Sequence, residues 1–67
     1  MLKFAERLRE VLEVNKISQA ELARKVGMAQ STVNKYCAGK KEPSLKVLFA
    51  ICQALDESAD YLLGLTD

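Results

Sequence analysis

One stretch of the sequence, residues 18–39, predicts two short helices joined by a tight turn. Ser18 is a good N-cap residue, and Glu21 follows three residues later, which is the spacing of a capping box. Gly27 comes directly after a cationic last turn, where a residue that is free to adopt the left-handed conformation ends a helix. A second helix restarts almost at once and ends at Gly39.

The connection between these two helices is too short for antiparallel stacking, so we expect them to cross steeply as a helix-turn-helix. A chain of 67 residues is one domain at most, here covering residues 1–67. Apolar periodicity and capping residues predict an all-α fold, a compact five-helix domain. The expected helices are residues 2–14, 19–26, 30–38, 45–55 and 59–63.

Apolar stripes identify the expected core. On the first helix the stripe consists of Phe4, Leu8, Val11 and Leu12. On the fourth it consists of Leu45, Leu48, Ile51, Cys52 and Leu55, widened by Val47 and Phe49. The inward residues of the third helix are Val33, Tyr36 and Cys37.

The first helix carries further signals on its polar side and at its end. Arg9 has the spacing to pair with Glu6 and Glu13 on the same helix. Asn15 and Lys16 are the expected exit, because asparagine tolerates the left-handed conformation.

Charge is distributed unevenly along the chain. The net charge is only +1, but residues 15–46 contain seven positive and two negative side chains, whereas the remainder contains three positive and seven negative ones. A basic middle between acidic ends is typical of a protein that presents one face to a polyanion. The alternative is ordinary solvated surface charge.

The residues needed for metal binding and catalysis are scarce. The chain has no histidine and two cysteines, so we expect no metal site and favour two buried thiols over a redox-sensing role for Cys37. It has no Gly-rich phosphate loop and no acid pair beside a nucleophile, so we expect neither an enzyme nor a cofactor. It has no signal peptide and no apolar run of membrane-spanning length, which predicts a cytoplasmic protein without membrane contact.

The stretch around the turn resembles the DNA-binding unit of the phage-repressor and Cro-like (XRE-type) helix-turn-helix family, and the resemblance extends over residues 8–63. The matching residues are Ser18, Gln19, Glu21, Leu22, Ala23, Gly27, Gln30, Ser31, Val33, Gly39, Lys40, Pro43 and Ser44. Position 37, often a structural glutamate in this family, is Cys37 here. The resemblance implies a lambda-repressor-like fold that binds the major groove of double-stranded DNA.

The outward face of the third helix is the candidate reader of DNA bases. Glutamine and asparagine can each bond an adenine edge, threonine offers a methyl to thymine, and lysine reaches guanine or phosphate. The expected base contacts are Gln30, Ser31, Thr32, Asn34 and Lys35. The expected phosphate contacts are Gln19, at a helix N-terminus, and Lys40, Lys41 and Lys46, just past the third helix. The alternative for all of them is a solvated polar surface.

The C-terminal segment is dense in apolar area for so short a tail. We assign Leu62 to the core and expect Tyr61, Leu63 and Leu65 to form a dimer interface, the alternative being that they pack back on the first and fourth helices. The expected function is a sequence-specific transcriptional regulator, a repressor that binds a palindromic operator as a homodimer. The alternative is an antitoxin or another protein-interaction module on the same fold, with a protein partner at this end.

Overall fold

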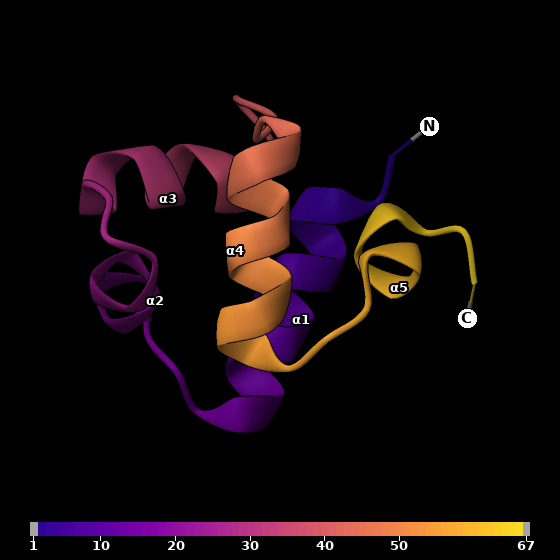
Figure 1. Cartoon of the computed structure of the whole chain (residues 1–67), viewed down its shortest axis with the longest axis horizontal. Helices are drawn as coiled ribbons and strands as arrows, with labels where there is room; N and C mark the ends of the chain where they lie inside the picture. The colour runs from indigo at the N-terminus through magenta and orange to yellow at the C-terminus, as the bar shows by residue number, and fades with distance from the viewer. Residues whose placement is uncertain (1, 67) are drawn as a thin grey trace.

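A computed structural model describes residues 2–66, and the regular structure within them consists of five helices (Figure 1). They are α1 (Phe4–Asn15), α2 (Gln19–Val26), α3 (Gln30–Cys37), α4 (Leu45–Leu55) and α5 (Ala59–Leu63). The expected all-α, five-helix architecture is therefore confirmed. None of the helices within this range is both long enough and apolar enough to cross a membrane.

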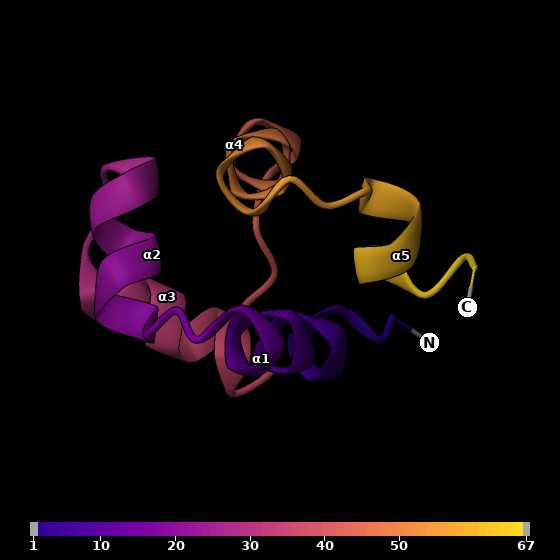
Figure 2. The ribbon, with the colours of Figure 1, turned by 90° about the horizontal axis from the view of Figure 1, so that it is seen from below.

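The helices surround one core and fall into two layers. Figure 2 shows α4 on one side of the molecule and α1 with α3 on the other, while α2 and α5 close the two ends. The buried side chains come from all five helices: Phe4, Leu8, Val11, Leu12, Leu22, Ala23, Val33, Tyr36, Cys37, Leu48, Ile51, Leu55 and Leu62. The stripe expected on α1 and the inward residues expected on α3 are confirmed.

Serine side chains begin three of the helices, and Ser18 begins α2 as the sequence predicts. The Oγ atoms of Ser18, Ser44 and Ser58 accept hydrogen bonds from the backbone N–H three residues further along, at 3.0, 3.3 and 3.1 Å. Each serine satisfies an N–H group that the helix itself leaves without a partner. These caps fix the starts of α2, α4 and α5.

The first helix differs from its expected limits at both ends, spanning Phe4–Asn15 instead of residues 2–14. Its exit also differs, because Lys16 and not Asn15 takes the left-handed conformation, with φ of 57°. The Asn15 amide donates instead to the carbonyl of Val11 at 2.9 Å, one turn back along the helix. This bond keeps Asn15 helical and moves the exit one residue further.

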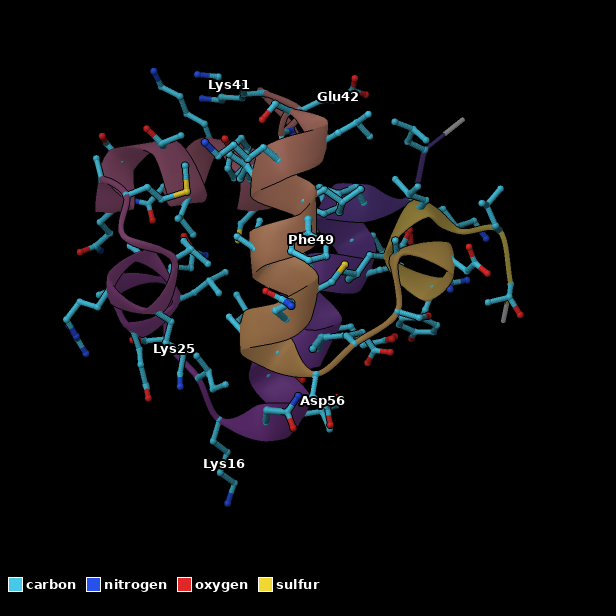
Figure 3. All side chains as sticks on the ribbon, in the orientation of Figure 1. Lys16, Lys25, Lys41, Glu42, Phe49 and Asp56 are labelled. Carbon is cyan, nitrogen blue, oxygen red and sulfur yellow. The ribbon has the colours of Figure 1, made fainter. Side chains whose placement is uncertain are left out.

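The stripe expected on α4 is wrong at two positions. Leu45 and Phe49 are 85% and 63% exposed, whereas Leu48, Ile51 and Leu55 are buried. The reason is that α4 packs against α2 and α5 on its inner side, and its outer side faces away from the other helices (Figure 2). Figure 3 shows Phe49 on this outer side.

Helix α5 is fastened to α1 at the opposite end of the molecule from α2. The Arg7 guanidinium donates to the carbonyl oxygens of Tyr61 and Thr66, at 2.9 and 2.7 Å. The Tyr61 hydroxyl donates to the Glu10 carboxylate. A Cβ atom on Gly64 would lie 3.1 Å from the Lys3 side chain, so the first and last turns of the fold touch.

Candidate nucleic-acid interface

Helices α2 and α3 pack on each other across a short turn. Figure 1 shows α2 end-on and α3 from the side, so the two helices cross instead of running parallel. Gly27, the C-cap of α2, has φ of 69°, and the following Met28 N–H donates to the carbonyl of Ala23 at 3.0 Å. Leu22 and Val33 are fully buried in the core. The expected helix-turn-helix is therefore present.

The outward face of α3 gathers the five residues predicted to contact bases. Gln30, Ser31, Asn34 and Lys35 are exposed, and Thr32 is half-buried at the boundary of the face. This arrangement places amide, hydroxyl and ammonium groups along one exposed side of a helix, where they are free to reach a ligand. Their contacts with DNA stay a prediction.

The first turn of α3 lacks both a side-chain cap and an acidic residue. Its N-cap is Ala29, whose methyl group cannot accept a hydrogen bond, in contrast to the serines that begin α2, α4 and α5. The positive end of the α3 dipole is therefore neither capped by a side chain nor neutralised by an acidic residue in its own first turn. Such an end attracts an anionic ligand.

The predicted phosphate contacts come from three elements of the chain. Gln19 is half-buried at the first residue of α2. Lys40 and Lys41 are exposed on the loop after α3, and Lys46 is exposed in the first turn of α4. In Figure 3, Lys41 lies at the end of the molecule that carries this loop and the start of α4.

The positive charge of residues 15–46 does not form one patch. Figure 3 shows Lys16 at the end of the molecule opposite Lys41, and Lys25 on the side of α2 that faces away from α3. Positive residues that cluster along the sequence are therefore spread over several sides of the folded molecule. Lys35 on α3, Lys40 and Lys41 on the following loop and Lys46 at the start of α4 are all exposed.

The C-terminal end of α3 is held by a residue that sequence reasoning missed. The helix ends at Cys37, one residue earlier than expected, and Gly39 follows with φ of 75°. The Arg9 guanidinium, from α1, donates to the Cys37 carbonyl. The spacing of charges on α1 had pointed to Glu6 and Glu13 as the partners of Arg9, and no local pattern indicates a bond to a carbonyl 28 residues away.

The two thiols of the chain are free, with Cys37 buried and Cys52 half-buried. Burial raises the pKa of the Cys37 thiol above its ordinary value of 9.0, against the smaller opposing effect of the positive charge of Arg9. Burial, and to a lesser extent the negative charge of Glu57, raises the pKa of Cys52. Both thiols are therefore protonated at neutral pH, as two packing residues would be. A glutamate at position 37 would lie among the buried side chains.

The residues predicted to form a dimer interface divide between the core and the surface. Tyr61 and Leu63 are half-buried and pack against the core, which is the alternative left open by the sequence. Leu65 is 74% exposed. Leu62 is fully buried, as predicted.

A shallow pocket of about 220 Å³ lies between the turn after α2 and the first half of α4. It is lined by Val26, Gly27, Met28, Lys46, Val47 and Ala50. Five of these residues are apolar, and Lys46 supplies the one charged group. The pocket offers no pair of groups suited to acid–base or nucleophilic chemistry.

Comparisons with known proteins agree with this geometry. The pattern of the family described as Helix-turn-helix matches residues 8–62. The chain is 39% identical over 64 residues to a protein of Bacillus subtilis (strain 168) named as an uncharacterized HTH-type transcriptional regulator, YobD. That alignment covers 96% of this chain and 57% of the relative. The chain spans little more than half the length of the curated relatives it matches first.

Solved structures show the same architecture. The restriction-modification controller protein C.AhdI of Aeromonas hydrophila superposes with a TM-score of 0.84 at 33% identity, covering 91% of this chain and 92% of that one. The P22 c2 repressor, solved in complex with a synthetic operator, superposes with a TM-score of 0.84 at 35% identity, covering 90% and 91%. The expectation of a fold without enzymatic activity is confirmed by these relatives. The chain belongs to the helix-turn-helix family.

Proposed function

We propose that this chain is a sequence-specific double-stranded DNA-binding transcriptional regulator, a repressor that binds a palindromic operator as a homodimer. The observation that carries the proposal is the exposed face of α3, which presents Gln30, Ser31, Asn34 and Lys35 beside an uncapped helix N-terminus. No acidic residue occurs between Glu21 and Glu42, so the face carries no charge that repels phosphate.

The residues of this surface divide into two roles. The side chains of residues 30–32, with Asn34 and Lys35, enter the major groove and set sequence preference through hydrogen bonds to base edges. Gln19, Lys40, Lys41 and Lys46 bond phosphates, fix the register on the duplex and make the affinity depend on salt. The P22 c2 repressor, which superposes on this chain at 35% identity, was solved with a synthetic operator, which supports the proposal that this fold binds an operator.

The small size of the DNA-contacting surface supports the proposed homodimer. A single short helix reads only a few base pairs, and proteins of this type bind two half-sites about one helical turn apart as dimers. We assign the dimer contact to the C-terminal segment, where Leu65 is exposed next to the half-buried Tyr61 and Leu63. Burying Leu65 against its symmetry mate removes apolar surface from water.

Selection from a random-sequence DNA pool at near-physiological salt, followed by sequencing, tests the proposal. Enrichment of a palindrome with half-sites about one turn apart is the expected result. Enrichment of a single half-site would refute the homodimer while leaving specific recognition intact. Retention of DNA without any enriched sequence would refute the regulator and reduce the function to non-specific binding.

A second candidate is a protein-interaction module, such as an antitoxin. It is favoured by Leu65, which is 74% exposed and follows the half-buried Tyr61 and Leu63, since exposed apolar surface can mark a protein contact. This candidate predicts no retention of DNA in the selection even at low salt. It also predicts a stoichiometric complex with a protein partner through the 61–65 segment.

A further inference from the structure

The last turn of α3 leaves one carbonyl without a backbone partner. The final four carbonyls of a helix have no intrahelical donor, and in α3 they belong to residues 34–37. Backbone N–H groups of residues 38, 39 and 40 donate to the carbonyls of residues 34, 36 and 35, at 2.9, 3.2 and 2.9 Å. The remaining carbonyl is that of Cys37, and Arg9 donates to it from α1.

This bond joins α3 to the helix that lies behind it. The Phe4 and Tyr36 rings pack in a T-shaped pair with 6.4 Å between their centroids, and a Cβ atom on Gly39 would lie 3.7 Å from that of Ala5. These contacts hold α3 against α1 by apolar packing, but they do not engage the carbonyl groups at the end of the helix. A charge-assisted hydrogen bond to a carbonyl is directional, and a cation at a helix C-terminus also complements the helix dipole.

We propose that Arg9 is a positioning residue for the DNA-reading surface, and this inference rests on the proposed function. Its bond to the Cys37 carbonyl fixes the C-terminal end of α3 against α1. The N–H of Lys40 donates to the carbonyl of Lys35, so the helix end, Lys35 and the start of the Lys40–Lys41 loop are held as one unit. Releasing the end displaces a base-contacting residue and a phosphate-contacting loop together.

The test compares Arg9→Met with the matched control Lys25→Met in binding to the operator obtained by selection. Both changes remove one positive charge and keep an unbranched apolar stem, and Lys25 lies on the side of α2 that faces away from α3. Arg9→Met is expected to weaken binding about tenfold, equivalent to ~1.4 kcal/mol, whereas Lys25→Met changes it less than about twofold. Equal effects of the two changes would overturn the inference.

The salt dependence separates positioning from direct contact. A side chain that bonds a phosphate adds about 0.9 to the slope of log affinity against log salt. Under the positioning role, Arg9→Met leaves this slope unchanged and alters preference at the base pairs read by Asn34 and Lys35. A slope reduced by about 0.9 with unchanged base preference would assign Arg9 to the phosphate contacts instead, and would overturn the inference.

Amide hydrogen exchange in the absence of DNA gives a readout that does not depend on the proposed function. Arg9→Met is expected to speed exchange at Gly39 and Lys40, whose N–H groups close the end of α3, while amides in α4 keep their protection. Arg9→Lys retains a cationic donor and is expected to restore part of the protection. Unchanged exchange at both sites would overturn the inference even if the DNA proposal stands.

The same measurements distinguish failure of the proposed DNA-binding function from failure of the positioning role of Arg9. If the wild-type chain selects no DNA sequence, the proposed function fails while the exchange experiment still decides whether Arg9 orders the end of α3. If the wild-type chain selects an operator and Arg9→Met binds it equally well, only the positioning role fails. Circular dichroism of each variant confirms that it is folded at the temperature of measurement.

Discussion

The guanidinium of Arg7 lies 4.3 Å from the centroid of the Tyr61 ring and donates a hydrogen bond to the carbonyl of the same residue. The Arg7 guanidinium therefore contacts both the Tyr61 ring and the backbone of α5. The Tyr61 hydroxyl returns to α1 through Glu10. A helix of five residues is too short to be stable by itself, so these contacts and the burial of Leu62 hold α5 in place.

Replacing Arg7 with Met is expected to destabilise the fold. The change removes a cation–π contact and at least one half-buried charged hydrogen bond while keeping most of the apolar stem. Such groups contribute about 1–3 kcal/mol to the free energy of unfolding. Urea denaturation followed by circular dichroism measures the loss, with Arg24→Met on the exposed side of α2 as the control. Equal stability of the two variants would contradict the prediction.

Replacing Gln30 with Ala is expected to change which sequences are bound. A bidentate contact between an amide side chain and an adenine edge is worth about 1–3 kcal/mol of discrimination against the wrong base. The variant should lose preference at particular base pairs of each half-site while its salt dependence stays the same. A binding scan over all single-base variants of the operator measures this. Equal weakening at every position of the scan would contradict the assignment of Gln30 as a base contact.

Replacing Lys40 with Ala is expected to weaken binding to all sequences alike. Lys40 is exposed on the loop past α3, and we expect its ammonium group to contact the DNA phosphate backbone, which carries no sequence information. Loss of one phosphate contact reduces the slope of log affinity against log salt by about 0.9. Titrations at several salt concentrations give the slope, and the same base scan serves as the control. A selective loss at one base pair would place Lys40 in the groove.

The buried thiol of Cys37 is expected to lower the free energy of unfolding as pH rises into the alkaline range. Because burial raises its pKa, the folded state holds the proton more tightly than the unfolded state. The stabilisation is complete below the ordinary thiol value of 9.0 and is lost as pH rises through the higher folded pKa. Denaturant titrations across this range should show a steeper loss for the wild type than for Cys37→Ala. A parallel decline of the two proteins would contradict the assignment.

Local signals were enough to predict most of the fold. The serine caps, the left-handed Gly27 and Gly39 and the apolar stripe of α1 each depend on residues within a few positions of one another. They fixed the order of the helices and the limits of α2, α4 and α5. The exposed face of α3 followed from the same periodicity, because its inward residues leave only one side to face solvent.

The parts that could not be predicted depend on residues distant in sequence. Arg9 meets the carbonyl of Cys37 across 28 positions, and Arg7 meets that of Tyr61 across 54. Charge spacing within α1 suggested partners on the same helix and carried no information about these carbonyls. The width of the apolar stripe on α4 was misread for a related reason, because periodicity does not tell how many helices cover a given helix. Phe49 is 63% exposed and lies on the outer side of α4 (Figure 3).

The contact between Lys3 and the backbone of Gly64 brings the segment before α1 close to the segment after α5. The packing of the five helices should therefore depend little on which loop contains the chain ends. A circularly permuted chain, with its old ends joined by a short linker and new ends placed in an exposed loop, satisfies the same interhelical contacts. We expect such a permuted chain to fold around the same core, because the packing of the helices and not their order along the sequence buries the apolar side chains.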